Sequence, residues 1–323
     1  MNKYQKTFNR NKTLYPNVFS VIKALPDKWV YGDKHTPKLR HPGAILNRAT
    51  EEIIGSFIKV YKALSDLKIA VSVTDKQSAV STLMQETATL FGHFDSFQDE
   101  CYLILKSLSP VPSPDLAPGE KTVNAWLKRN GYECSSDFLS RTHNIQQLID
   151  CFTNRLKHAN QKLEFVSVQA GKISIDGFFI EELKADELCN FYQPLPKKGK
   201  TTVLGISFNS MLRILWLSFY ELCDAIEKVI KKHIKTLHGE DFTKRDIVKH
   251  DQRFLEVTEL MVNSKEFFYP YEYRKYAKIS IQGDILSISY PHHCNIPYPG
   301  PLQVQSMHGA DGYTKTFTLP FFG

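Results

Sequence analysis

The sequence lacks the motifs that mark the common hydrolases and nucleotide-dependent enzymes. It contains no Gly-x-Ser-x-Gly elbow, no His-Glu-x-x-His pair and no paired-carboxylate motif. Gly199-Lys200-Thr201-Thr202 matches the end of a phosphate-binding loop, but residue 194, where that loop requires glycine, is a proline. We therefore exclude a P-loop and interpret the neighbouring Lys197, Lys198 and Lys200 as an exposed basic turn able to contact nucleic acid.

Metal-ligand patterns are missing as well. The six cysteines form no Cys-x-x-Cys pair, and the adjacent histidines of His292-His293-Cys294 cannot easily face one metal from a regular element. The sequence therefore predicts no metal site and no cofactor. Cys101, Cys151 and Cys223 fall in expected helices, where free thiols behave as small buried side chains. This usage favours a reducing cytoplasm over secretion.

Long apolar runs are scarce. The longest, residues 211–220, is interrupted by Arg213 and is too short to cross a bilayer. The N-terminus is basic and lacks the apolar centre of a signal peptide. We expect a soluble, cytoplasmic protein with no membrane partner.

Composition indicates a sizeable folded core and a mildly positive surface. Hydrophobic residues make up 42% of the 323 residues and aromatic residues 12%, as in globular proteins. The net charge is +7 and the pI is about 8.9. Such a balance is compatible with a nucleic-acid or acidic partner, and equally with an ordinary solvated surface.

Helical periodicity dominates the first half of the chain. Residues 1–42 are basic, punctuated by prolines and expected to be irregular. Apolar residues then recur at three- and four-residue steps in segments that predict helices over 43–66, 75–108, 120–130 and 136–163. We predict a bundle of about four or five helices over residues 43–163.

Strand signals begin near residue 163. Residues 165–168 and 172–175 alternate with period two, and Asp176-Gly177 after them is a hairpin signal. A similar Lys-Ile-Ser-Ile run returns at residues 278–281. We expect the two similar runs to lie in one small antiparallel sheet.

The remaining segments complete the predicted fold. A strongly amphipathic stretch predicts a helix over 207–236, and Asp241 is a plausible N-cap for a second helix over 242–263. The proline-rich tail, 291–323, is expected to be irregular, with one strand at 314–319. The fold class is α+β and mainly α: a helical bundle followed, over 164–323, by helices with a small antiparallel sheet.

One group of polar residues lies on a single flank of the helix expected over 142–163. Arg155, His158 and Lys162 project together there, and Asn154 lies just beyond. Such a flank can grip phosphates, with His158 acting as general base toward a ribose 2′-hydroxyl and Arg155 stabilising the developing oxyanion. Alternatively, these cations simply complement the dipole at the C-terminus of a helix.

A second group is Arg245-Asp246-Ile247-Val248-Lys249-His250. A helical bundle with an Arg…His motif resembles the HEPN (higher eukaryotes and prokaryotes nucleotide-binding) superfamily. The family pattern is Arg, four to six residues, then His, commonly with Asn, Asp or His after the Arg. The stretch from Arg245 to His250 fits this pattern, whereas only two residues separate Arg155 from His158. On a helix Arg245 and His250 lie about 140° apart, so they need a cleft or a partner chain to converge.

The resemblance implies a metal-independent RNase that forms dimers and serves in bacterial toxin or antiviral defence systems. His158 or His250 would activate the 2′-hydroxyl, Arg155 or Arg245 would stabilise the phosphorane, and Asn154 would orient the reacting groups.

An aromatic and basic strip over residues 267–278 includes Tyr273, Arg274 and Lys275. Exposed, it would stack bases and neutralise phosphates; buried, it would be an aromatic approach to a strand. Two functions therefore remain open. One is a HEPN-like RNA-binding effector or a HEPN-like metal-independent endoribonuclease. The other is a non-catalytic subunit that binds nucleic acid, a protein partner or a second copy through the basic N-terminus and this strip.

Overall fold

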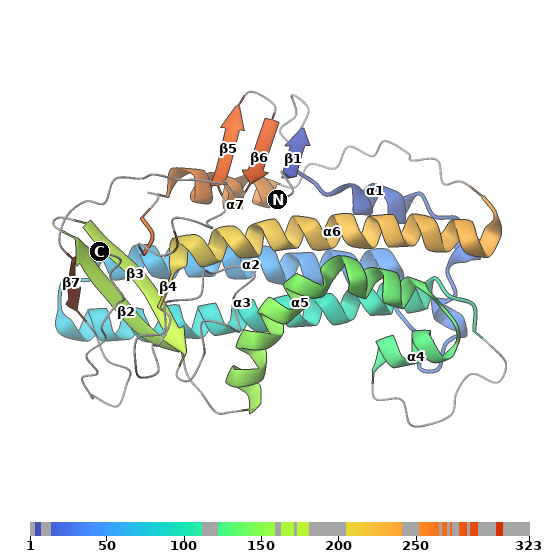
Figure 1. Cartoon of the computed structure of the whole chain (residues 1–323), viewed down its shortest axis with the longest axis horizontal. Helices are drawn as coiled ribbons and strands as arrows, with labels where there is room; N and C mark the ends of the chain where they lie inside the picture. The colour runs from blue at the N-terminus through green and yellow to red at the C-terminus, as the bar shows by residue number, and fades with distance from the viewer. Residues whose placement is uncertain are drawn as a thin grey trace, which may run out of the picture.

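Helices dominate the computed structural model of the chain, which is α+β and mainly α as the sequence predicts (Figure 1). The structure describes residues 4–7, 14–111, 122–158, 163–170, 173–180, 205–240, 252–264, 267–269, 272, 278–282, 285–289 and 302–305.

The bundle is built on a helical hairpin. Helices α2 (Pro42–Ile69) and α3 (Val73–Ser107) run antiparallel along its whole length. Helix α5 (Cys134–His158) packs on α3, and α6 (Phe208–His238) packs on α5, α3 and α1 (Asn17–Lys23). The short α4 (Val123–Arg129) lies at the end where α3 finishes (Figure 1).

Helix α6 runs through the centre of the core. Every residue from Phe208 to Tyr220 except Asn209 is buried. Trp216 meets Phe57 of α2 edge-on with ring centroids 5.2 Å apart, and Phe219 meets Phe97 of α3 at 5.5 Å. Aromatic contacts of this kind bury large areas in fixed geometry, so the core is continuous between the expected bundle and the second half of the chain.

Arg213 is a buried cation inside this apolar helix. It is 1% exposed, and its guanidinium donates to the carbonyl oxygen of Met261 at 2.8 Å and to that of Ser264 at 3.4 Å. These carbonyls lie at the C-terminal end of α7 (Gln252–Asn263), where the last carbonyls of a helix need donors and the helix dipole favours a cation. Arg213 thus joins α7 to α6.

Two antiparallel sheets flank the bundle. One has the order β4 (Ile206–Ser207), β3 (Ile173–Ile180), β2 (Leu163–Ala170), β7 (Leu302–Gln305). The other has the order β1 (Tyr4–Thr7), β6 (Ile285–Ser289), β5 (Lys278–Gln282). The first lies at the end of the bundle opposite α4 (Figure 1). The expectation that the two Lys-Ile-Ser-Ile runs share one sheet is wrong. Ile173–Ile175 belongs to β3 in the first sheet, and Lys278–Ile281 belongs to β5 in the second.

Gly177 lies in the middle of β3, so the expectation of a hairpin turn at Asp176-Gly177 is wrong. It pairs with Val166 of β2 and Ser207 of β4. A Cβ at this position would lie 2.5 Å from the hydroxyl oxygen of Tyr269. That hydroxyl donates to the carbonyl oxygen of Val166 at 3.1 Å. The glycine therefore serves the close approach of Tyr269 across the strand rather than a turn.

Other boundaries differ from the sequence-based expectation. The helix expected over 136–163 ends at His158, and Leu163 is instead a buried residue of β2. The N-terminal region expected to be irregular contains β1, α1 and 3-10 helices at Asp27–Trp29 and Gly32–Lys34. The start expected for the helix over 242–263 and the strand expected over 314–319 lie outside the described residues.

None of the helices in the described part of the chain is long and apolar enough to cross a membrane. The described cysteines are free thiols, and Cys101 and Cys223 are buried in helices as expected. Cys151 is only half-buried.

Candidate nucleic-acid interface

Most of the residues selected from the sequence fall outside the described part of the chain. These are Lys162, Lys197, Lys198, Lys200, Arg245, His250, Tyr273, Arg274 and Lys275. His158 is the last residue of α5, and its side chain is also outside the described set. The convergence of Arg245 with His250 therefore stays a prediction.

Asn154 and Arg155 occupy the last turns of α5. Asn154 is exposed and Arg155 is half-buried, which is the flank position expected from the helical periodicity. The turn is anchored by Phe152, which is fully buried and stacks on Phe91 of α3 with ring centroids 4.4 Å apart. The backbone that presents Asn154 and Arg155 is thus held against the core.

The surroundings of this turn are acidic. Lys157 forms an ion pair with Asp95 of α3. Burial, followed by the charges of neighbouring carboxylates including Asp95, raises the pKa values of Asp99 on α3 and Asp150 on α5. The Lys157 ammonium opposes this effect at both sites. A phosphate approaching this side of α5 would meet carboxylates, and Lys157 is already engaged.

A strongly basic surface lies instead on residues 17–41, here called the basic segment. It carries five lysines or arginines against two acidic residues, and the structure exposes all seven: Lys23, Lys28, Lys34, Lys38, Arg40, Asp27 and Asp33. The segment comprises α1 and its connection to α2, at the end of the bundle where α6 finishes (Figure 1). An excess of exposed cations at one end of a rigid scaffold is the electrostatic footprint of a polyanion partner.

Aromatic rings accompany these lysines. His238, in the last turn of α6, lies parallel to Trp29 with ring centroids 4.8 Å apart and to Tyr31 at 6.5 Å. The ammonium of Lys28 lies 5.6 Å from the Trp29 ring and that of Lys34 lies 5.1 Å from the Tyr31 ring. Burial and the nearby Lys28 lower the pKa of His238, against the opposing effect of Glu240, which favours a neutral stacking ring at pH 7. Trp29 is 5% exposed, so it supports the His238 ring from below, and the half-buried rings of Tyr31 and His238 lie beside the exposed lysines. Half-buried rings beside cations are a combination that binds single-stranded nucleic acid.

Hydrogen bonds to the end of α3 hold the basic segment in place. The backbone N–H of Tyr31 donates to the carbonyl oxygen of Ser107 at 2.7 Å. The Nε2 atom of His35 lies 3.3 Å from the carbonyl oxygen of Ser109, and the Ser109 hydroxyl lies 2.9 Å from Nε2 of His233 on α6. The segment is therefore attached to the end of α3, which Ser109 in turn joins to α6.

The positive charge of the N-terminus is visible in the sequence, whereas Trp29, Tyr31 and His238 are not among the site residues expected from it. The sequence signal that could indicate this site is the alternation of basic and aromatic residues at Lys28, Trp29, Tyr31 and Lys34. It has the same character as the aromatic and basic strip over 267–278.

Comparisons with family models, curated proteins and solved structures find no match to this chain. Within the described residues, no three His, Cys, Asp or Glu side chains are grouped so that they could hold a metal ion.

Proposed function

We propose that the protein is an RNA-binding effector that contacts the phosphate backbone through its basic segment. The observation that carries the proposal is the exposure of all five cations of residues 17–41, with Lys28 and Lys34 beside the rings of Trp29 and Tyr31. Phosphate contacts supply most of the affinity of such proteins, and stacking on the half-buried Tyr31 ring favours single strands. This proposal matches the non-catalytic alternative more closely than the RNase.

The first expected result concerns Lys28 and Lys34. Changing both to alanine removes two phosphate contacts and is expected to weaken binding of a labelled single-stranded oligoribonucleotide about tenfold at low salt. The slope of log affinity against log salt concentration is expected to become shallower by about 1.4, or about 0.7 for each contact on a single strand. Fluorescence anisotropy over a salt series measures both quantities.

A matched variant, Lys59→Ala with Lys62→Ala, removes two exposed lysines from α2 outside the basic segment. It is expected to bind the oligoribonucleotide as the wild type does. Equal weakening by both double variants would mean that only the net charge matters, and the proposed interface would be rejected.

We keep a HEPN-like, metal-independent endoribonuclease of a bacterial toxin or antiviral system as a second candidate. The observation that favours it is the placement of Asn154 and Arg155 one turn from His158 at the end of a helix anchored by Phe152. The fit of the Arg245 to His250 stretch to the family pattern adds to it.

Cleavage of a mixed RNA panel in EDTA separates the two candidates. Metal-independent cutting that is lost in His158→Ala or in His250→Ala would support the RNase and assign its base, because a general base contributes about a hundredfold or more to rate. Intact RNA with folded, RNA-bound wild type would leave the non-catalytic effector as the function.

A further inference from the structure

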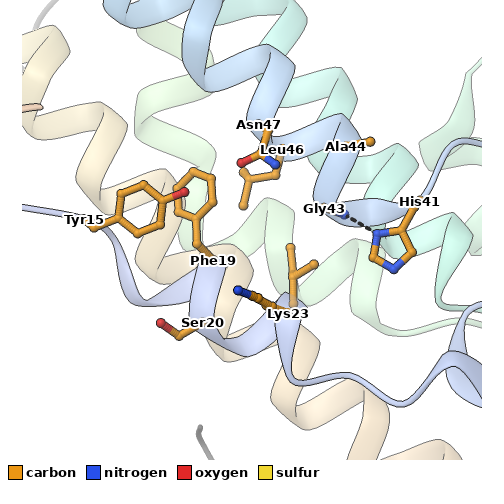
Figure 2. A pocket seen from close by; sticks show the side chains of 10 residues that line it. Tyr15, Phe19, Ser20, Lys23, His41, Gly43, Ala44, Leu46 and Asn47 are labelled. Carbon is orange, nitrogen blue, oxygen red and sulfur yellow. Dashed lines mark hydrogen bonds between the residues drawn. The ribbon is translucent and has the colours of Figure 1, made fainter. Parts of the chain in front are cut away.

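A cavity of about 370 Å³ lies between α1 and the first turns of α2. Figure 2 shows Tyr15 and Phe19 at one end, His41 at the other, and Lys23 between them, with Leu46 and Asn47 on the α2 side. Leu46 is buried, whereas Lys23, His41 and Asn47 are exposed. The cavity therefore has an apolar floor and a polar rim, as small-molecule sites do, and its volume is within their usual range.

The aromatic end is held rigidly. The Tyr15 and Phe19 rings have centroids 4.2 Å apart with planes at 35°. The Tyr15 ring also meets Phe254 of α7 in a T-shaped contact with centroids 5.4 Å apart. A planar ligand entering the cavity meets the half-buried Tyr15 and the buried Phe19 in positions that are already set, so little ordering cost opposes contact with these rings.

The other end favours an anion. The described residues that line the cavity include Lys23 and His41 and no acidic side chain. The backbone N–H of Gly43 donates to Nδ1 of His41 at 3.1 Å. Because Nδ1 accepts this bond, the neutral imidazole carries its hydrogen on Nε2, which is then a donor. The Lys23 ammonium supplies a full positive charge.

We propose that this cavity binds one nucleotide, with the base against Tyr15 and Phe19 and the phosphate between Lys23 and His41. The Asn47 side chain offers both a donor and an acceptor to a base edge. The source of the nucleotide is either a free mononucleotide or one unit of an RNA strand. The second source rests on the proposed function, because Lys23 belongs to the basic segment that would carry the strand.

Two surface changes test the site without touching the core. Asn47→Trp replaces an exposed rim residue and fills the cavity, while Lys23→Glu reverses the charge at the phosphate position. Each is expected to weaken binding of adenosine or uridine monophosphate at least tenfold in titration calorimetry. In Lys23→Glu the reason is the loss of one charge-assisted hydrogen bond, which accounts for about that factor, and in Asn47→Trp it is the loss of the space for the ligand. Adenosine and inorganic phosphate, each carrying half of the ligand, are expected to bind more weakly than the monophosphate. Lys62→Glu, on an exposed face of α2, is the matched control.

The outcomes separate this inference from the proposed function. Weaker oligoribonucleotide binding in Asn47→Trp would identify a unit of the strand as the ligand. Mononucleotide binding that depends on Lys23, with no oligoribonucleotide binding by wild type, would support the cavity and reject the RNA-binding function. Oligoribonucleotide binding lost in the Lys28 and Lys34 double variant but unchanged in Asn47→Trp, together with no cavity-dependent mononucleotide binding, would overturn the inference and leave the function standing.

Discussion

Replacing Arg213 with alanine is expected to lower the free energy of unfolding by about 4 kcal/mol. The side chain is 1% exposed, so its removal leaves both a cavity in the core and buried carbonyl groups without their donor. Met261 and Ser264 present those carbonyls at the end of α7. A loss of this size is a large fraction of the stability of an ordinary domain. Urea unfolding followed by tryptophan fluorescence measures it.

Arg213→Met separates the two contributions. Methionine retains much of the apolar volume but none of the donors, so it is expected to recover about half of the loss. If the alanine variant fails to fold, the methionine variant still allows the loss of stability to be measured. Lys228→Ala, at an exposed position of the same helix, is expected to cost less than about 0.5 kcal/mol. A loss below about 1 kcal/mol in Arg213→Ala would mean that the end of α7 does not depend on this cation.

The second large effect is a dependence of stability on pH that comes from His233. Burial, helped by the neighbouring His238, lowers the pKa of His233 from 6.5 to about 4. The folded protein therefore binds fewer protons here than the unfolded chain, and stability is lost as the pH falls from 6.5 toward 4. Between pH 7 and pH 5 this single group is expected to remove about 2 kcal/mol.

Two carboxyl groups act in the opposite direction. Burial raises the pKa of Glu272 to about 7, even though the backbone N–H groups of Ser207 and Tyr269 donate to it. Burial and then Asp224 raise the pKa of Glu221 to about 7. Both groups favour folding below pH 4.5, and their contribution is lost as the pH rises through 7. The net profile of the wild type mixes these effects, so the contribution of His233 is best read as a difference from a variant.

His233→Phe provides that difference. Phenylalanine keeps a ring against Tyr132, which His233 meets edge-on at 5.7 Å. The Ser109 hydroxyl keeps its bond to the carbonyl oxygen of Leu105 at 2.8 Å. The stability gap between wild type and variant is expected to shift by about 2 kcal/mol in favour of the variant from pH 7 to pH 5. Between pH 7 and pH 9 the gap is expected to stay constant. A gap that does not move below pH 7 would contradict the lowered pKa.

The long helices could be predicted from the sequence because their apolar stripes extend over many turns. The helices expected over 43–66, 75–108 and 207–236 match α2, α3 and α6 to within a few residues. Strand partners could not be predicted in the same way. Period-two alternation indicates which face of a strand is buried but says nothing about its neighbour, so two similar runs were assigned to one sheet. The predicted turn at Gly177 is wrong for a related reason, since glycine occurs both in turns and where another group approaches the backbone closely.

Of the candidate site, only the excess of positive charge could be predicted from the sequence. The basic character of the N-terminus is visible in Lys23, Lys28 and Lys34, but the parallel stacking of His238 on Trp29 depends on how α6 ends relative to the first segment. No local pattern records that relation, because the two residues are far apart in the sequence. The flank position of Arg155 can be predicted from helical geometry alone. The acidic residues that α3 places near Lys157 cannot be predicted in this way, because they depend on how α3 packs against α5.

The attachment of the basic segment to α6 also has a consequence for synthesis on the ribosome. The hydroxyl of Tyr220 donates at 2.8 Å to the carbonyl oxygen of Leu14, 206 residues earlier, and His238 lies later still. Domains generally acquire structure as they emerge, N-terminal part first. Here the bonds of Tyr31 and His35 can form once α3 has been translated, whereas the contacts of Leu14 and Trp29 must wait for α6. The surface that would meet RNA is therefore completed only after α6 has been translated, and a nascent chain that stops before α6 is expected to present this surface without the His238 ring.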